Sequence, residues 1–282
     1  MDYRLQAWSV LCDESLFAAA GPTVDPVICK AFATHNPWWQ RYTEGIARLL
    51  GSPPIPMAVA PFGASHEQIL NGSVTVPKGF LLGQTTLKFQ QTHFIRGDCA
   101  ACFFDLSEEG STEHYTLALR QERVAVGRSN LLETVAGMCD IERGGSFLLP
   151  AGAVGERIRK EVVEETGHDF DVARFINLSA WQHEKAKGLL GYHPEDDVTK
   201  ATPLSPGGSD EHCIMFAYSA VLPPGSLMAM HGKVAGLKAE GESTLVQILP
   251  MADAHFLIKD TKFHTAHNLW RLYLAAVGAA HT

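Results

Sequence analysis

The chain has 282 residues, of which 46% are hydrophobic and 19% are charged, and its net charge at neutral pH is -8. A chain of this size and composition can bury a full core as one large domain or two smaller ones. No run of Lys and Arg is present and no stretch approaches the roughly 18 apolar residues of a membrane span, so we expect neither a nucleic-acid nor a membrane partner.

The first 90 residues are irregular in pattern. Their opening, MDYRLQAWSVLCDESLF, carries early acidic residues and lacks the basic-then-apolar order of a secretion signal, so we expect a cytoplasmic protein. Pro53, Pro54 and Pro56 separate an apolar, helix-like stretch from strand-like runs such as GFLLGQTTLKF. We therefore predict a small β-rich N-terminal domain over residues 1–90.

Residues 91–282 form a second predicted domain with a denser pattern of elements. Strands are predicted at 99–106, 114–126, 174–180, 213–222 and 243–250, and helices near 155–166 and 261–279. Strands on both sides of one central helix indicate the α/β (α+β) class, with a mixed sheet between helices. The polar stretch between Trp181 and Gly208 is predicted to be a long loop. Cys99 and Cys102 form a CxxC, but their surroundings, GDCAACFFDL, favour a buried strand over a zinc site.

The central helix carries an unusual group of acidic residues at its end. In EVVEETG (161–167), helical spacing gathers Glu161, Glu164 and Glu165 on one face next to Gly167. Like charges at these spacings destabilise a helix by roughly 0.2–0.5 kcal/mol per pair, and the negative end of the helix dipole increases the penalty. Hard cations such as Mg²⁺ bind oxygen ligands and commonly lie between carboxylates and phosphates. We predict a metal and phosphate site here.

The alternative interpretation of this segment is a solvated acidic face on which Lys160 pairs with Glu164. A second acidic segment, HGKVAGLKAEGE (231–242), ends in Glu240 and Glu242 immediately before a predicted strand. These two carboxylates are placed to reach the same metal centre from a loop.

Two segments, KEVVEETGH (160–168) and LLETVAGMCD (131–140), together resemble the signature of the Nudix hydrolases. The second is similar to the Glu-Leu-Pro-Ala-Gly segment of the branch that hydrolyses ADP-ribose and nucleoside diphosphate sugars. We place the opening glycine at Gly137 rather than at Gly152 of LLPAG. The signature has about 15 positions between its glycine and the glutamate that matches Glu161. Gly137 lies 24 positions before Glu161, so it requires an insertion, which costs little loop entropy. Gly152 lies only 9 positions before Glu161, so that choice would require a deletion of part of the site.

Further segments resemble the same branch, and some positions differ from it. SPGGSDEHCIMFAY (205–218) is similar to its glycine-rich turn, and LKAEGESTLVQILP (237–250) to its late acidic loop. The chain has Lys160 where the family has Arg, His168 where it has an apolar residue, and an insertion near 141–151. The ammonium group of Lys cannot make the planar, bidentate contact with a carboxylate that a guanidinium makes.

The resemblance implies roles for individual residues. It implies that Glu161 and Glu165 are the principal ligands of Mg²⁺, with Mn²⁺ as a substitute, that Glu164 shares a second ion, and that the backbone carbonyl of Ala136, before Gly137, completes the shell. It further implies a catalytic base at Glu240 or Glu242, of which we favour Glu242 because it adjoins the strand, and substrate contacts by Arg123, Glu211 and Gly137.

The function that the resemblance implies is a Mg²⁺-dependent pyrophosphatase. It would split ADP-ribose, ADP-glucose or a UDP-sugar into a nucleoside monophosphate and a sugar phosphate, as a homodimer in which residues 1–90 form the dimer contact and a wall of the substrate site. Two alternatives stay open: a Nudix-fold module that binds a nucleotide sugar without hydrolysing it, and a Nudix hydrolase of another diphosphate such as a dinucleotide.

Overall fold

The computed structural model describes residues 41, 47, 55–62, 78–86, 90–95, 97–123, 126–139, 151–192, 201–236 and 243–279. The chain divides into two compact units. The first comprises Met1–Asp98, Asp140–Phe147 and Pro203–His212, and the second comprises Cys99–Cys139, Leu148–Thr202 and Cys213–Thr282. Among the described residues, no helix is long and apolar enough to cross a bilayer.

The first unit contains a three-stranded antiparallel sheet in the order β1-β2-β3. Its strands are β1 (Ile55–Phe62), β2 (Lys78–Thr86) and β3 (Gln90–Ile95). The turn between Ser205 and Ser209 joins the end of this sheet, because Phe94 donates its amide to the Gly208 carbonyl at 2.8 Å. Asp210 returns the contact by donating to the Phe94 carbonyl at 3.3 Å. A chain segment more than 100 residues further along is therefore hydrogen-bonded to the end of this sheet.

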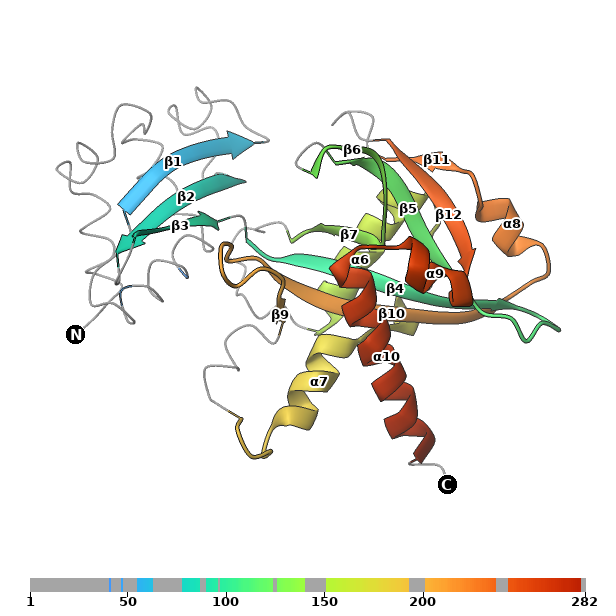
Figure 1. The fold of residues 1–282 in the computed structure, drawn as a ribbon. Helices are drawn as coiled ribbons and strands as arrows, with labels where there is room; N and C mark the ends of the chain where they lie inside the picture. Colours follow the sequence, from blue (N-terminus) through green and yellow to red (C-terminus); the bar gives the residue numbers. More distant parts are fainter. Residues whose placement is uncertain are drawn as a thin grey trace. The chain divides into compact units, whose positions relative to one another are not determined.

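The second unit is built on a mixed sheet in the order β11-β12-β5-β4-β10-β8 (Figure 1). β4 and β10 run parallel, with Cys99 opposite Cys213, whereas β12, β5 and β4 are antiparallel. The strands are β4 (Cys99–Glu108), β5 (Tyr115–Arg123), β6 (Arg128–Glu133), β7 (Val135–Met138), β8 (Phe175–Asn177), β9 (Thr202–Pro203), β10 (His212–Leu222), β11 (Val234–Ala235) and β12 (Thr244–Pro250).

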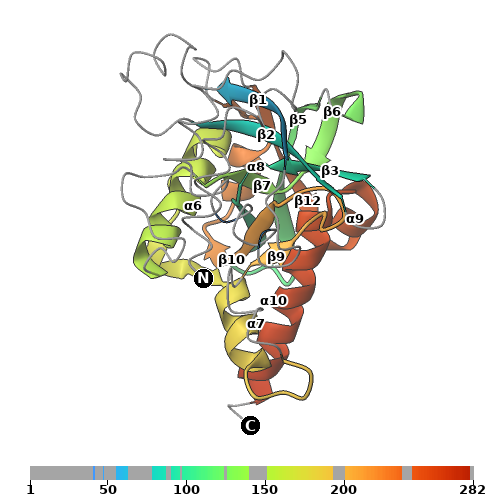
Figure 2. The ribbon, with the colours of Figure 1, turned by 90° about the vertical axis from the view of Figure 1, so that its left-hand side faces the viewer.

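Helices cover both faces of this sheet. α6 (Ala151–Thr166) lies on one face and α10 (Thr261–Ala279) on the other, as the two views show (Figures 1 and 2). Successive side chains of a strand point to opposite faces. Accordingly, Phe103 packs on Phe263 of α10 with ring centroids 5.7 Å apart, while Phe104 packs on Phe170, just after α6, at 5.2 Å. The predicted α/β class with a sheet between helices is confirmed.

The two central strands β4 and β5 diverge at the point where β6 and β7 join the sheet. β4 and β5 are paired at Leu106 and Tyr115, and beyond this point β6 pairs with β5 while β7 pairs with β4. Thr134 stands at the step between β6 and β7, where its hydroxyl donates to the Cys102 carbonyl at 2.6 Å. The step places β7 beside α6, and β7 carries Ala136 and Gly137.

One part of the prediction was wrong. The stretch after Trp181 was expected to be a loop, and the strand before it was expected to continue to residue 180, but β8 ends at Asn177 and α7 (Leu178–Ala186) follows at once. The Asn177 side chain accepts a hydrogen bond from the Ala180 amide at 2.9 Å, which is the geometry of a helix N-cap. Trp181 then packs against Tyr273 of α10. A cap residue within a strand-like run decided the local structure. The remaining elements are the 3-10 helix η2 (Val172–Arg174), α8 (Ser226–Met230) and α9 (Met251–Leu257).

Candidate functional site

The carboxylate of Glu161 lies directly against the backbone of Gly137. A Cβ atom added to Gly137 would lie 1.9 Å from Oε2 of Glu161 and 2.1 Å from its Cδ, well inside van der Waals contact. The absence of a side chain at this position therefore makes room for the carboxylate. The glycine and the glutamate are 24 positions apart in the sequence and meet because α6 packs on β7.

Glu165 reaches the same strand one residue earlier. Its Oε2 accepts a hydrogen bond from the Ala136 amide at 3.2 Å, and the residue is only 6% exposed. Because Glu161 and Glu165 are one helical turn apart, their carboxylates meet consecutive residues of β7. The structure thus brings together two predicted metal ligands, Glu161 and Glu165, and the strand residues that they contact. The four residues meet where α6 packs on β7, at Ala136 and Gly137.

The end of α6 is held by backbone contacts from two other segments. Gly236 donates its amide to the Glu164 carbonyl at 2.9 Å, and the Thr244 hydroxyl donates to the Glu165 carbonyl at 2.6 Å. The helix stops at Gly167, which has a positive φ of 68° and donates to the Val163 carbonyl at 2.8 Å. The last turn of α6, which carries Glu164 and Glu165, is therefore fixed at several points.

Glu164 is in a different situation from the other two glutamates. Its carboxylate lies 3.6 Å from the Lys160 ammonium, one helical turn earlier, and the Lys160 side chain is 60% exposed. The neighbouring Arg159 guanidinium donates to both oxygens of Asp169 at 2.6 Å. A role for Glu164 at a second ion stays a prediction.

The other predicted residues lie in separate surroundings. Arg123 donates its Nε to Oε1 of Glu133 at 2.7 Å, and the Arg123 side chain is 41% exposed. Glu211 belongs to the first unit, where its amide binds the Ser209 hydroxyl at 3.2 Å. Glu240 and Glu242 lie outside the described residues.

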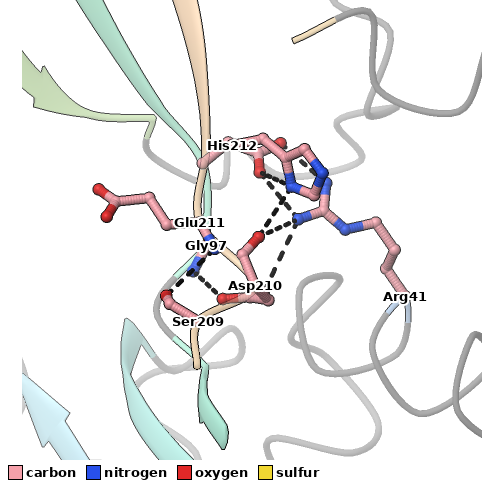
Figure 3. A network of polar contacts seen from close by, with 7 residues as sticks. Arg41, Gly97, Ser209, Asp210, Glu211 and His212 are labelled. Atoms are coloured by element: carbon pink, nitrogen blue, oxygen red, sulfur yellow. Dashed lines mark hydrogen bonds and ion pairs between the residues drawn. The ribbon is translucent and has the colours of Figure 1, made fainter. Parts of the chain in front are cut away.

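Figure 3 shows the polar network that surrounds Glu211 in the first unit. The Arg41 guanidinium donates to both oxygens of Asp98, at 2.9 and 2.8 Å, and to the Asp210 carbonyl at 3.3 Å. Asp210 also accepts from the Gly97 amide at 3.2 Å. The Glu211 side chain points away from Arg41 (Figure 3). The network fixes the turn, and the contact of Glu211 with the substrate stays a prediction.

Sequence reasoning missed a group of buried charges next to Thr134. Glu133, 5% exposed, lies between Arg123 and Lys262, whose Nζ is 3.9 Å from Oε2 of Glu133 and 3.0 Å from Oδ1 of Asp260. Burial alone lowers the pKa of Lys262, but Asp260 and Glu133 more than offset this effect, so its pKa is raised. Asp260 also accepts the Thr134 amide at 3.2 Å, which ties the start of α10 to the step before β7. No motif marked these residues, because they meet only through packing.

The donor chemistry of the junction fits Mg²⁺. Glu161 and Glu165 offer hard carboxylate oxygens, and the space left by Gly137 admits one of them to the strand. Among the residues that the structure describes, no three His, Cys, Asp or Glu side chains are arranged to hold a metal ion. The further positions around such an ion would belong to backbone oxygens, water and substrate phosphates, as is common for Mg²⁺.

Over 179 residues the chain is 28% identical to Nudix hydrolase 14, chloroplastic, from Arabidopsis thaliana. The chain is similar to a Nudix hydrolase. The match covers 64% of this chain and 50% of the relative, so the chain spans about half the length of the curated Nudix protein that it matches.

No family model matches the chain. A crystal structure of an ADP compounds hydrolase aligns with a TM-score of 0.41 at 16% identity, covering 80% of this chain and 96% of that one.

Proposed function

We propose that this Nudix-like chain is a Mg²⁺-dependent pyrophosphatase that splits a nucleoside diphosphate sugar into a nucleoside monophosphate and a sugar phosphate. The observation that carries the proposal is the close contact between the Glu161 carboxylate and the backbone of Gly137. The Glu165 carboxylate accepts a hydrogen bond from the amide of the adjacent Ala136. A carboxylate in close contact with a glycine backbone is stronger support for a built metal site than an acidic helix face exposed to water would be. The similarity to a Nudix hydrolase supports the same reaction class.

In this proposal, Glu161 and Glu165 would hold the metal ion. A bound Mg²⁺ neutralises charge on phosphoryl oxygens and acidifies an attacking water. The chain's own contribution is orientation. The Ala136 amide fixes one oxygen of Glu165, and the contacts of Gly236 and Thr244 hold the backbone of the last turn in place. This rigidity keeps both carboxylates in one geometry before substrate binds.

Either Glu240 or Glu242 is proposed as the general base, with preference for Glu242. Both lie outside the described residues, but the residues that flank this stretch do not. Gly236 precedes it and binds the Glu164 carbonyl, while Thr244 follows it and binds the Glu165 carbonyl. Gly236 and Thr244 therefore both lie at the acidic end of α6. This supports a base from this segment, since a base must come within hydrogen-bond reach of its water.

The proposed substrates are ADP-ribose, ADP-glucose and UDP-sugars, with Arg123 facing the diphosphate. The guanidinium of Arg123 is bound through Nε to Glu133, and 41% of the side chain is exposed. A guanidinium that a buried carboxylate orients in this way is suited to bind phosphate oxygens. A homodimer, with residues 1–90 at its contact and beside the substrate, remains part of the proposal.

Incubating the protein with ADP-ribose and Mg²⁺ tests the proposal, with products followed by ³¹P NMR. We expect AMP and ribose phosphate from the wild type and at least about a 100-fold lower kcat/KM for Glu165→Gln, because a metal ligand matters more than its outer-shell partners, which are worth 10–100-fold. Glu184→Gln, which alters an exposed glutamate paired with Lys187, is the matched control and should retain full activity.

Two other outcomes would contradict the proposal. Equal turnover by the wild type and the Glu165→Gln variant would show that Glu165 does not hold a metal for this reaction. Binding of ADP-ribose by both proteins with no product from either would favour the nucleotide-sugar binding module. That alternative is motivated by Lys160, His168 and the insertion near 141–151, which differ from the Nudix signature.

A further inference from the structure

Gln121 is a buried polar residue that the roles above do not use. It lies in β5 and is 9% exposed, on the same face of the strand as Leu117 and Leu119, both fully buried. It pairs with Leu131 of β6. A glutamine in this position removes a polar amide from water, and such burial is unfavourable unless the amide finds hydrogen-bond partners.

The side-chain amide nitrogen of Gln121 lacks a partner in the part of the chain that the structure describes. Its Nε2 is buried and makes no hydrogen bond there. Other polar groups around it have partners: Arg123 binds Glu133, and Thr244 binds the Glu165 carbonyl. An unpaired buried donor costs about 1–3 kcal/mol, so a residue of this kind requires an explanation.

The register of the sheet places Gln121 beside the acidic end of α6. Arg120 is paired with Leu245 in β12, and extending this antiparallel register by one residue sets Gln121 opposite Thr244. Side chains at such neighbouring positions share a face of the sheet, with Cβ atoms roughly 5 Å apart. Thr244 uses this face to reach Glu165, which shows that the face is turned towards α6.

We propose that Gln121 is a substrate-binding residue whose Nε2 donates a hydrogen bond to an anionic oxygen of the phosphorylated ligand held near Glu161 and Glu165. The inference rests on the proposed function and adds a residue to it. The amide suits this role because its Nε2 is a neutral donor that none of the described residues uses.

Two variants and a matched control test this role. Gln121→Met keeps the length and removes the donor, and Gln121→Glu keeps the shape and replaces the donor with a negative charge. Gln247→Met is the control, because Gln247 lies on the opposite face of β12 and its Nε2 binds the Val246 carbonyl. The probe is α,β-methylene ADP-ribose with Mg²⁺, measured by calorimetry, together with thermal unfolding of each protein without ligand.

We expect Gln121→Met to bind the probe at least about 10-fold more weakly, the effect of losing a hydrogen bond to a charged group. Its unfolding temperature should be unchanged or higher, because an unpaired buried donor has been removed. Gln121→Glu should bind more weakly still, since it sets a carboxylate against phosphate, and Gln247→Met should bind like the wild type.

The proposal is overturned if Gln121→Met binds the probe as tightly as the wild type, whatever activity the wild type has. It is also overturned if Gln121→Met unfolds several degrees earlier while binding is retained, or if Gln121→Glu binds normally. Weaker binding by Gln121→Met together with an absence of hydrolysis by the wild type would contradict the pyrophosphatase but support the role of Gln121.

Discussion

At the scale of single residues, the site depends on the close approach of the Glu161 carboxylate to the backbone of Gly137. Gly137 contributes only its lack of a Cβ, and Glu161 occupies the space that results. The obstructing atoms are the far end of a flexible side chain, so a larger residue at position 137 would turn the carboxylate away instead of breaking the fold. A substitution at this position is therefore expected to lower activity strongly and stability only slightly.

Gly137→Ala should lower activity on ADP-ribose by at least about 100-fold, because displacing Glu161 is equivalent to losing a ligand. Its free energy of unfolding should fall by about 1 kcal/mol or less, since the glutamate can rotate into another rotamer. Activity assays and urea unfolding measure the two effects. Gly278→Ala, at an exposed position of α10 with open space around it, is the control and should leave activity unchanged. A Gly137→Ala variant with full activity would show that the contact is not needed.

At the scale of elements, α9 and α10 are joined by histidine rings packed against the sheet. The rings of His255 and His267 are 4.3 Å apart, and His267 also lies 5.0 Å from the ring of Phe103 in β4. Burial, together with the charge of His255 and Arg271, lowers the pKa of His267 to about 4, although Asp105 acts in the opposite direction. His267 is thus a neutral packing residue.

Stability should depend on pH through His267. Its folded pKa is lower than the value of 6.5 expected in the unfolded chain, so the contribution is complete above pH 6.5 and is lost as pH falls towards 4. Because the ring is only half buried, screening limits the loss to about 1–2 kcal/mol. Urea unfolding at pH 8, 6.5 and 5 measures it. His267→Phe, which keeps an aromatic ring, should flatten this dependence, and an unchanged slope would contradict the assignment.

At the scale of the whole molecule, each unit is held by residues that are distant in the sequence. In the first unit, Arg41, Asp98 and Asp210 meet with side chains that are 14%, 10% and 9% exposed. Ion pairs of this kind give little net stability, but removing one partner leaves a buried charge uncompensated. The network therefore fixes how three chain segments meet within the first unit (Figure 3).

Arg41→Met should lower the free energy of unfolding by about 3–5 kcal/mol, because Asp98 and Asp210 lose their shared cation. Adding Asp98→Asn to this variant should recover part of the loss, since one of the unpaired charges is removed. Lys187→Met, which breaks an exposed pair with Glu184, should cost less than about 1 kcal/mol. Denaturant unfolding compares the proteins, and similar small losses in all of them would show that the network is not buried as described.

The sequence by itself determined the features that depend on local spacing. The period of apolar residues predicted β4, β10, β12, α6 and α10, and the spacing within EVVEETG placed Glu161 and Glu165 one turn apart. The choice of Gly137 over Gly152 also came from spacing, and the structure puts Gly137 against Glu161.

Only the tertiary structure decided the features that depend on packing between distant segments. The partnership of Glu133 and Asp260 with Lys262, the unpaired amide of Gln121, and the attachment of Gly236 and Thr244 to the end of α6 leave no periodic pattern in the sequence. Periodicity reports which face of an element is buried, but it does not report which residues of another element that face will meet. The register of the sheet and the divergence of β4 from β5 set those partners.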